Sequence, residues 1–200
     1  MKKTNVQKLT IAAIMGTISF ILIYLSFSVP ILSPFAELDL SALPELIGGF
    51  ILGPVGAVEI IVIKIVLKLL FDGTTSAFTG ELQNLILSIA YVLPAVIYYQ
   101  KHKTKKGAII GIVIGCILSI IISIFTNIYL IFPAFMYLYG MNWDIIIDTC
   151  AKINPYIKDI PTFVIFSVVP FNIVSRTITS ILTILVYKRI SKPLKNFIAA

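Results

Sequence analysis

The sequence is poor in the side chains that carry catalytic chemistry. Its 200 residues include one histidine and two cysteines. The histidine, His102, lies among lysines, where a solvated loop residue is a simpler interpretation than a metal ligand. A zinc site requires a cluster of His and Cys ligands, and a serine nucleophile requires a neighbouring base. We therefore expect neither a metal site nor a catalytic serine.

Two further absences concern energy and hydrolysis. The sequence has no Gly-x-x-x-x-Gly-Lys-Ser/Thr loop of the kind that cradles nucleotide phosphates. It also places no aspartate inside a confident membrane span, where an intramembrane protease with paired aspartates would need one. We therefore expect that the chain is not an enzyme, that it holds no resident cofactor, and that any energy from ATP comes from a partner.

Charge is scarce as well. Only 12% of the residues are charged and 58% are hydrophobic, with a mean hydropathy of +1.02, which is too apolar for a soluble domain. The net charge of +7 would suggest nucleic acid as the partner of a soluble protein. Here the lysines and arginines flank apolar runs, as the positive-inside rule describes. The sequence predicts one all-α domain over residues 1–200, with the lipid bilayer as its surroundings and no nucleic acid partner.

The apolar runs predict six transmembrane helices. About 20 helical residues are needed to cross ~30 Å of hydrocarbon, and five runs are long enough or nearly so; the sixth is short and rich in glycine. Lysine-rich segments lie at the start, in the middle and at the end of the chain, and six spans with both termini in the cytoplasm put all of them inside. The predicted spans are residues 9–29, 40–53, 56–71, 78–99, 107–132 and 161–187.

Small residues recur at helical spacing in two of these spans. Gly107, Gly111 and Gly115 begin a ladder that continues through two serines and predicts close packing between helices. Ala12 and Gly16 form a second small-x-x-x-small pair on the first span. Spacing alone leaves open whether that pair packs internally or docks a partner helix.

Polar residues inside the spans predict a ligand site. In hydrocarbon such groups are costly, and here they gather near the outer ends of the fourth, fifth and sixth spans. Neutral amides and hydroxyls suit a ligand rich in hydrogen-bonding groups, although hydrogen bonding between helices is an open alternative. Lys64 and Lys68, an i, i+4 pair, would repel each other unless Glu45, Glu59 or Glu81 intervenes or they extend outward.

Several segments, taken together and in order, resemble the riboflavin-specific S components of energy-coupling factor (ECF) transporters. They run through residues 39–54, 73–84, 91–94 and 103–108, then Asn127-x-Tyr129 and Pro170-Phe-Asn172. The similarity covers nearly the whole chain. It implies a subunit of the bacterial cell membrane that captures riboflavin from outside for an ATP-driven vitamin importer. A transmembrane coupling protein and two ATPase subunits would be its partners.

The resemblance also implies roles for individual residues. The first outer loop, residues 30–40, would close over the flavin, and Ala12 and Gly16 would dock the coupling protein. Ser175 and Arg176 stand where the family usually has lysine and glycine, so another flavin such as FMN, or another vitamin, is an alternative ligand. A stand-alone facilitator or structural protein is the competing class. The expected substrate-binding residues are Leu38, Asp39, Leu40, Thr79, Gly80, Glu81, Asn84, Asn127, Asn172, Ser175 and Arg176.

Overall fold

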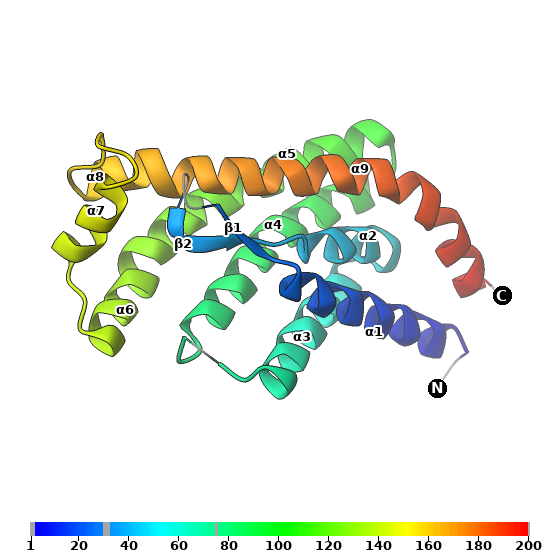
Figure 1. Cartoon of the computed structure of the whole chain (residues 1–200). Helices are drawn as coiled ribbons and strands as arrows, with labels where there is room; N and C mark the ends of the chain where they lie inside the picture. Colours follow the sequence, from blue (N-terminus) through cyan, green and yellow to red (C-terminus); the bar gives the residue numbers. More distant parts are fainter. Residues whose placement is uncertain (1–2, 30–32, 75, 200) are drawn as a thin grey trace.

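The computed structural model describes residues 3–29, 33–74 and 76–199, and helices dominate this part of the chain (Figure 1). The longer helices are α1 (Lys3–Tyr24), α2 (Ala42–Leu52), α3 (Pro54–Phe71), α4 (Thr79–Lys101), α5 (Lys105–Thr126) and α9 (Val169–Ala199). Shorter elements are α6 (Phe132–Tyr139), α7 (Trp143–Ala151), α8 (Ile160–Phe163) and the π-helical segments η1 (Asn127–Ile131) and η2 (Val164–Val168). Strands β1 (Phe27–Val29) and β2 (Ser33–Leu38) form one antiparallel pair.

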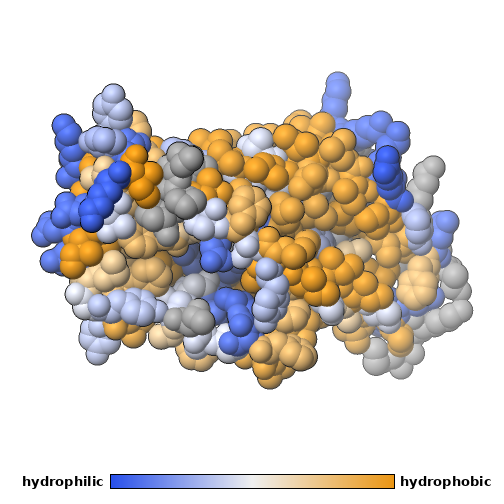
Figure 2. All heavy atoms as spheres, in the orientation of Figure 1, coloured by the Kyte–Doolittle hydropathy of each residue, from blue (hydrophilic) through white to orange (hydrophobic). Residues whose placement is uncertain are grey.

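Among the described residues, four helical stretches are long and apolar enough to cross a membrane: Asn5–Tyr24, Thr79–Lys101, Lys105–Tyr139 and Ile160–Ser191. The protein is therefore a multi-pass membrane protein by the length and composition of its helices. The helices at the other two predicted spans do not meet these criteria. Helix α2 is too short, with only 11 residues, and α3 carries three charged residues, Glu59, Lys64 and Lys68. Figure 2 shows an apolar middle with hydrophilic residues gathered toward both ends of the molecule.

The end of the first predicted span is wrong. The helix stops at Tyr24, and Phe27 then pairs with Leu38, and Ser28 with Glu37, in the β1–β2 hairpin. The Ser26 hydroxyl donates to the Glu37 carboxylate at 2.6 Å, which ties the end of α1 to β2. These contacts come from residues about ten positions further along the chain, which hydropathy does not register, so hydropathy alone extended the helix too far. Part of the predicted outer loop, residues 30–32, lies outside the described residues.

The segment between the last two predicted spans, residues 133–160, is itself largely helical, because it contains most of α6 and all of α7. Phe132, Phe163 and Trp143 pack together there over the buried Cys150. Burial raises the pKa of the Cys150 thiol to about 11, so the thiol is protonated at neutral pH. At the start of α8, hydrogen bonds from Thr162 lower the pKa of the Asp159 carboxyl. Helices α6, α7 and α8 cap one end of the bundle (Figure 1).

The glycine ladder packs α5 directly on α4. A Cβ atom added at Gly111 would lie 2.6 Å from the Ala95 carbonyl oxygen, and one added at Gly115 would lie 2.1 Å from that of Tyr91. Real Cβ atoms do not approach so closely, so only glycine permits this contact. The internal packing role expected for the ladder is confirmed.

The second small-residue pair, Ala12 and Gly16, faces the interior. Ala12 is fully buried, and a Cβ atom added at Gly16 would lie 2.6 Å from Cγ2 of Ile63 on α3. The prediction that these two residues dock a partner helix is therefore corrected: α3 already occupies that face of α1. The neighbouring small pair, Ala13 and Thr17, is on the exposed face.

Candidate ligand site

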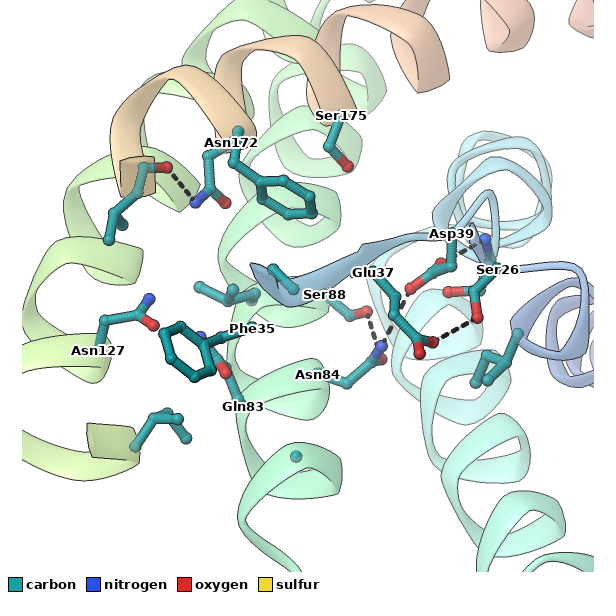
Figure 3. Close-up of a pocket in the computed structure, with 18 of the residues that line it drawn as sticks. Ser26, Phe35, Glu37, Asp39, Gln83, Asn84, Ser88, Asn127, Asn172 and Ser175 are labelled. Carbon is teal, nitrogen blue, oxygen red and sulfur yellow. Dashed lines mark hydrogen bonds between the residues drawn. The ribbon is translucent and has the colours of Figure 1, made fainter. Parts of the chain in front are cut away.

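A cavity of about 270 Å³ opens between α4, η1, the start of α9 and the β1–β2 hairpin. This volume is near the lower end for small-molecule sites, about 300 to 1,000 Å³. Figure 3 shows labelled side chains from all four of these elements around the same space. The cavity therefore brings together segments that the sequence separates by more than 100 residues.

Helix α4 supplies one polar wall. Gly80, Asn84 and Ser88 follow each other at i, i+4 spacing, and all three line the cavity. Gln83 adds a further amide from the same helix (Figure 3). The absence of a side chain at Gly80 lets the Ser76 hydroxyl accept from its backbone N–H at 2.9 Å. The i, i+4 spacing of Gly80, Asn84 and Ser88 thus gives α4 a single polar face, and this face lines the cavity.

Asn127 and Asn172 form the opposite wall, on η1 and α9 (Figure 3). The Asn127 amide nitrogen donates to the Ser123 carbonyl at 2.7 Å, and that of Asn172 donates to the Val168 carbonyl at 2.9 Å. Each amide donates one of its two N–H groups to its own helix, which fixes the side chain, and its oxygen can accept from a ligand. π-Helical turns precede or contain both contacts, and such turns occur frequently at functional sites.

Beneath the α4 wall lies a buried charge pair. Lys64 on α3 and Glu45 on α2 are both fully buried and form an ion pair. The Lys64 ammonium also donates to Oδ1 of Asn84 at 2.6 Å and to the Ser88 hydroxyl at 2.9 Å. The second lysine of α3, Lys68, lines the cavity and pairs with Glu81 at 2.7 Å. Each lysine thus has its own carboxylate partner, which offsets the repulsion expected from their spacing.

The hairpin covers the cavity from its remaining side. Glu37 and Asp39 line the cavity, and Oδ1 of Asp39 accepts from the Ser41 backbone N–H at 2.7 Å. Phe35 of β2 projects into the same space in Figure 3, and its ring packs edge-on against Phe132 at 5.7 Å. Because strand side chains alternate, this arrangement turns Leu38 away from the cavity.

Seven of the predicted binding residues line the cavity: Asp39, Gly80, Asn84, Asn127, Asn172, Ser175 and Arg176. The other four predicted residues are not among those that line it. Leu38 is buried at 2% exposure in the core, and Leu40 leads into the first turn of α2. The Thr79 hydroxyl donates to the Ser76 carbonyl, and Glu81 is held by Lys68. These four side chains belong to the walls and supports of the described cavity.

Sequence reasoning missed the aromatic lining, which comprises Phe35, Phe132, Phe135, Phe163 and Phe171. Only Phe171 carried a local signal, since it directly precedes Asn172. The other four come from the hairpin, α6 and α8, which sequence periodicity did not connect with the polar helices. The guanidinium of Arg176 lies 4.9 Å from the centre of the Tyr91 ring, a cation–π contact.

The described residues contain no group of three or more His, Cys, Asp or Glu side chains that could hold a metal ion. The cavity instead offers aromatic side chains beside amides, two carboxylates and the cationic side chains of Lys68 and Arg176. Such a lining suits a small organic molecule with a planar apolar part and several hydrogen-bonding groups.

Several known proteins are similar to this chain. Residues 7–187 match the family model described as "ECF transporter, substrate-specific component". The riboflavin transporter RibU of Staphylococcus aureus is 29% identical over 98% of this chain and 97% of its own length. RibU of Streptococcus thermophilus is 30% identical over 98% and 86%, and the riboflavin transporter FmnP of Bacillus subtilis is 25% identical over 92% and 91%.

The fold is similar to a solved structure as well. That structure is described as the S component of a bacterial ECF transporter, and it superposes with a TM-score of 0.74. The two chains are 27% identical, and the superposition covers 96% of this chain and 99% of the other.

Proposed function

Since this chain belongs to the family of substrate-specific components of ECF transporters, we propose that it binds riboflavin in the cavity between α4, η1, α9 and the hairpin. The observation that carries the proposal is the convergence of Asn84, Asn127 and Asn172 on one cavity with an aromatic lining. The isoalloxazine ring presents a flat apolar body with imide and carbonyl edges, and the ribityl chain presents hydroxyls. Amides and phenylalanines match these groups.

The proposed setting is the bacterial cell membrane, crossed six times, with both termini in the cytoplasm. In Figure 1 the start of α1, the turn between α4 and α5, and the end of α9 lie toward the same end of the molecule. The lysine-rich residues 101–106 belong to that turn. The positive-inside rule then supports the cytoplasmic side for this end and the outer side for the cavity.

The proposed role is delivery rather than catalysis. The chain would capture the vitamin without any resident cofactor, and a coupling protein with two ATPase subunits would supply the energy. The exposed small pair of α1, Ala13 and Thr17, supports a docking face, because small residues let two helices approach closely in lipid. Another flavin or vitamin in the same cavity is the alternative ligand, and a stand-alone facilitator is the alternative role.

Purified protein in detergent is expected to quench the fluorescence of added riboflavin with a stoichiometry near one to one. Transfer of the ring from water to a cavity lined by aromatic and amide side chains alters its emission, which makes binding measurable. Titration with FMN and with an unrelated vitamin serves as the comparison. A protein that stays colourless after growth in rich medium, and that leaves riboflavin fluorescence unchanged, would show that the ligand is a different molecule.

Leucine at both Ala13 and Thr17 is expected to weaken assembly with the coupling protein while riboflavin binding persists. Added bulk at a tight helix contact costs about 1 to 3 kcal/mol, which corresponds to roughly 5- to 150-fold in affinity. Co-purification of the coupling protein measures the effect. Val113→Leu is the matched control, because it adds bulk on the exposed face of α5 instead. Unchanged co-purification would place the docking face elsewhere.

A further inference from the structure

The orientation of the Asn84 amide is dictated by a residue that lies behind the cavity wall. Lys64 is fully buried, and its ammonium lies 2.6 Å from one atom of the Asn84 amide. An ammonium group has three donors and no acceptor. The amide atom nearest to it must therefore be the oxygen.

This contact leaves the Asn84 nitrogen on the cavity side. The nitrogen donates to Oδ2 of Asp39 at 3.4 Å, which is long for an N–H···O bond. Lys64 and Asp39 thus hold opposite ends of the amide, and the Lys64 end is held far more closely. The nitrogen is therefore only weakly hydrogen-bonded and can donate to a ligand.

The Lys64 ammonium is itself held in place by groups from α2, α4 and the residue before α2. Glu45 of α2 provides the opposite charge, while Ser88 of α4 and Ser41 before α2 accept at 2.9 and 3.3 Å. The Ser19 hydroxyl of α1 donates to the Ser41 carbonyl at 2.5 Å, which holds Ser41 in turn. A buried ion pair with this many partners fixes the ammonium in one position. The fixed ammonium in turn fixes the orientation of the Asn84 amide.

We infer that Lys64 is a positioning residue that makes Asn84 a hydrogen-bond donor to the ligand, whereas Asn127 and Asn172 act as acceptors. The inference rests on the proposed function, because it states how the same cavity recognises riboflavin. The α4 wall then selects a ligand that presents an acceptor, such as a ring carbonyl. The opposite wall selects a donor, such as an imide N–H or a hydroxyl. This arrangement of a donor on one wall and acceptors on the other discriminates among flat molecules of similar size.

A thermodynamic cycle tests whether Lys64 acts through Asn84. The four proteins are the parent, the pair replacement Lys64→Met with Glu45→Met, Asn84→Ala, and all three changes together. Replacing both charges by apolar side chains avoids an unpaired buried charge. Riboflavin dissociation constants are measured by fluorescence quenching, and melting temperatures are recorded on the same samples.

The pair replacement and Asn84→Ala are each expected to weaken riboflavin binding about tenfold. The triple variant is expected to bind no more weakly than Asn84→Ala, because the inference assigns the effect of Lys64 on the ligand to Asn84 and not to Ser88, its other contact on the cavity wall. Independent losses that multiply to about a hundredfold in the triple variant would overturn the inference. A purely structural role of the pair would produce that multiplication.

Asn84→Asp provides a second test that does not depend on the stability of the pair replacement. Aspartate keeps the size of the side chain and an oxygen toward Lys64, but it cannot donate when ionised. Binding at least tenfold weaker than the parent supports the inference, and parent-like binding overturns it. If the parent itself fails to bind riboflavin, the proposed function is wrong and this inference falls with it; if the parent binds and either test fails, only the inference falls.

Discussion

Replacing Glu45 with alanine is expected to lower the free energy of unfolding by about 3 to 5 kcal/mol, the usual effect of removing one partner from a buried ion pair. Lys64 would keep a charge that is fully buried and would lose its counter-ion. The neighbouring Asn84 and Ser88 are neutral, so they cannot replace the lost carboxylate. Denaturation in detergent, followed by circular dichroism, measures the change.

Two further variants test whether the loss of stability comes from the unpaired buried charge. Glu45→Met combined with Lys64→Met removes both charges and is expected to recover most of the lost stability. Glu59→Ala removes an exposed carboxylate from α3 and is expected to change stability by less than about 0.5 kcal/mol. If Glu45→Ala is as stable as the double variant, the charge on Lys64 is not confined to the interior as the structure describes.

Truncating Asn172 to alanine is expected to weaken riboflavin binding by roughly 5- to 150-fold, equivalent to about 1 to 3 kcal/mol. Asn172 is 6% exposed, and its nitrogen is already bound to the Val168 carbonyl. Its oxygen is therefore the group that a ligand donor would meet. Loss of that oxygen leaves the ligand donor buried without an acceptor, which is the costly case.

The neighbouring residue offers the control for this measurement. Ile173 is exposed on the same helix, so Ile173→Ala removes side-chain volume without touching the cavity and is expected to leave the dissociation constant unchanged. If Asn172→Ala binds riboflavin as tightly as the parent, the start of α9 does not contact the ligand. The polar groups on that helix would then serve contacts between helices.

Much of the architecture follows from the sequence alone. Hydropathy located the long helices because each must present apolar side chains to lipid over its whole length. Helical spacing placed Gly80, Asn84 and Ser88 on one face, and asparagines within apolar runs identified two of the helices that meet at the cavity. The cost of polar groups in hydrocarbon makes such residues informative even without a partner in view.

Hydropathy and helical spacing could not predict which distant residues pair with each other. Spacing showed that Lys64 and Lys68 needed carboxylates, but three glutamates were available, and only the packing of α2, α3 and α4 assigned Glu45 to one lysine and Glu81 to the other. The spacing of Ala12 and Gly16 was equally compatible with an inward or an outward face, because a small residue permits close approach to any neighbour.

The hairpin is the clearest case of a feature that only the tertiary structure decided. Phe27–Val29 are apolar enough to continue the first helix, and strand pairing became favourable only because Phe27 and Ser28 meet Leu38 and Glu37 of β2. That pairing brings Phe35 and Asp39 to the cavity. The sequence by itself therefore determined a helical membrane protein with a polar site, because hydropathy and helical period act locally. The tertiary structure decided the aromatic wall, the charge partners and the inward face of α1, because each depends on contacts between segments that are distant in the chain.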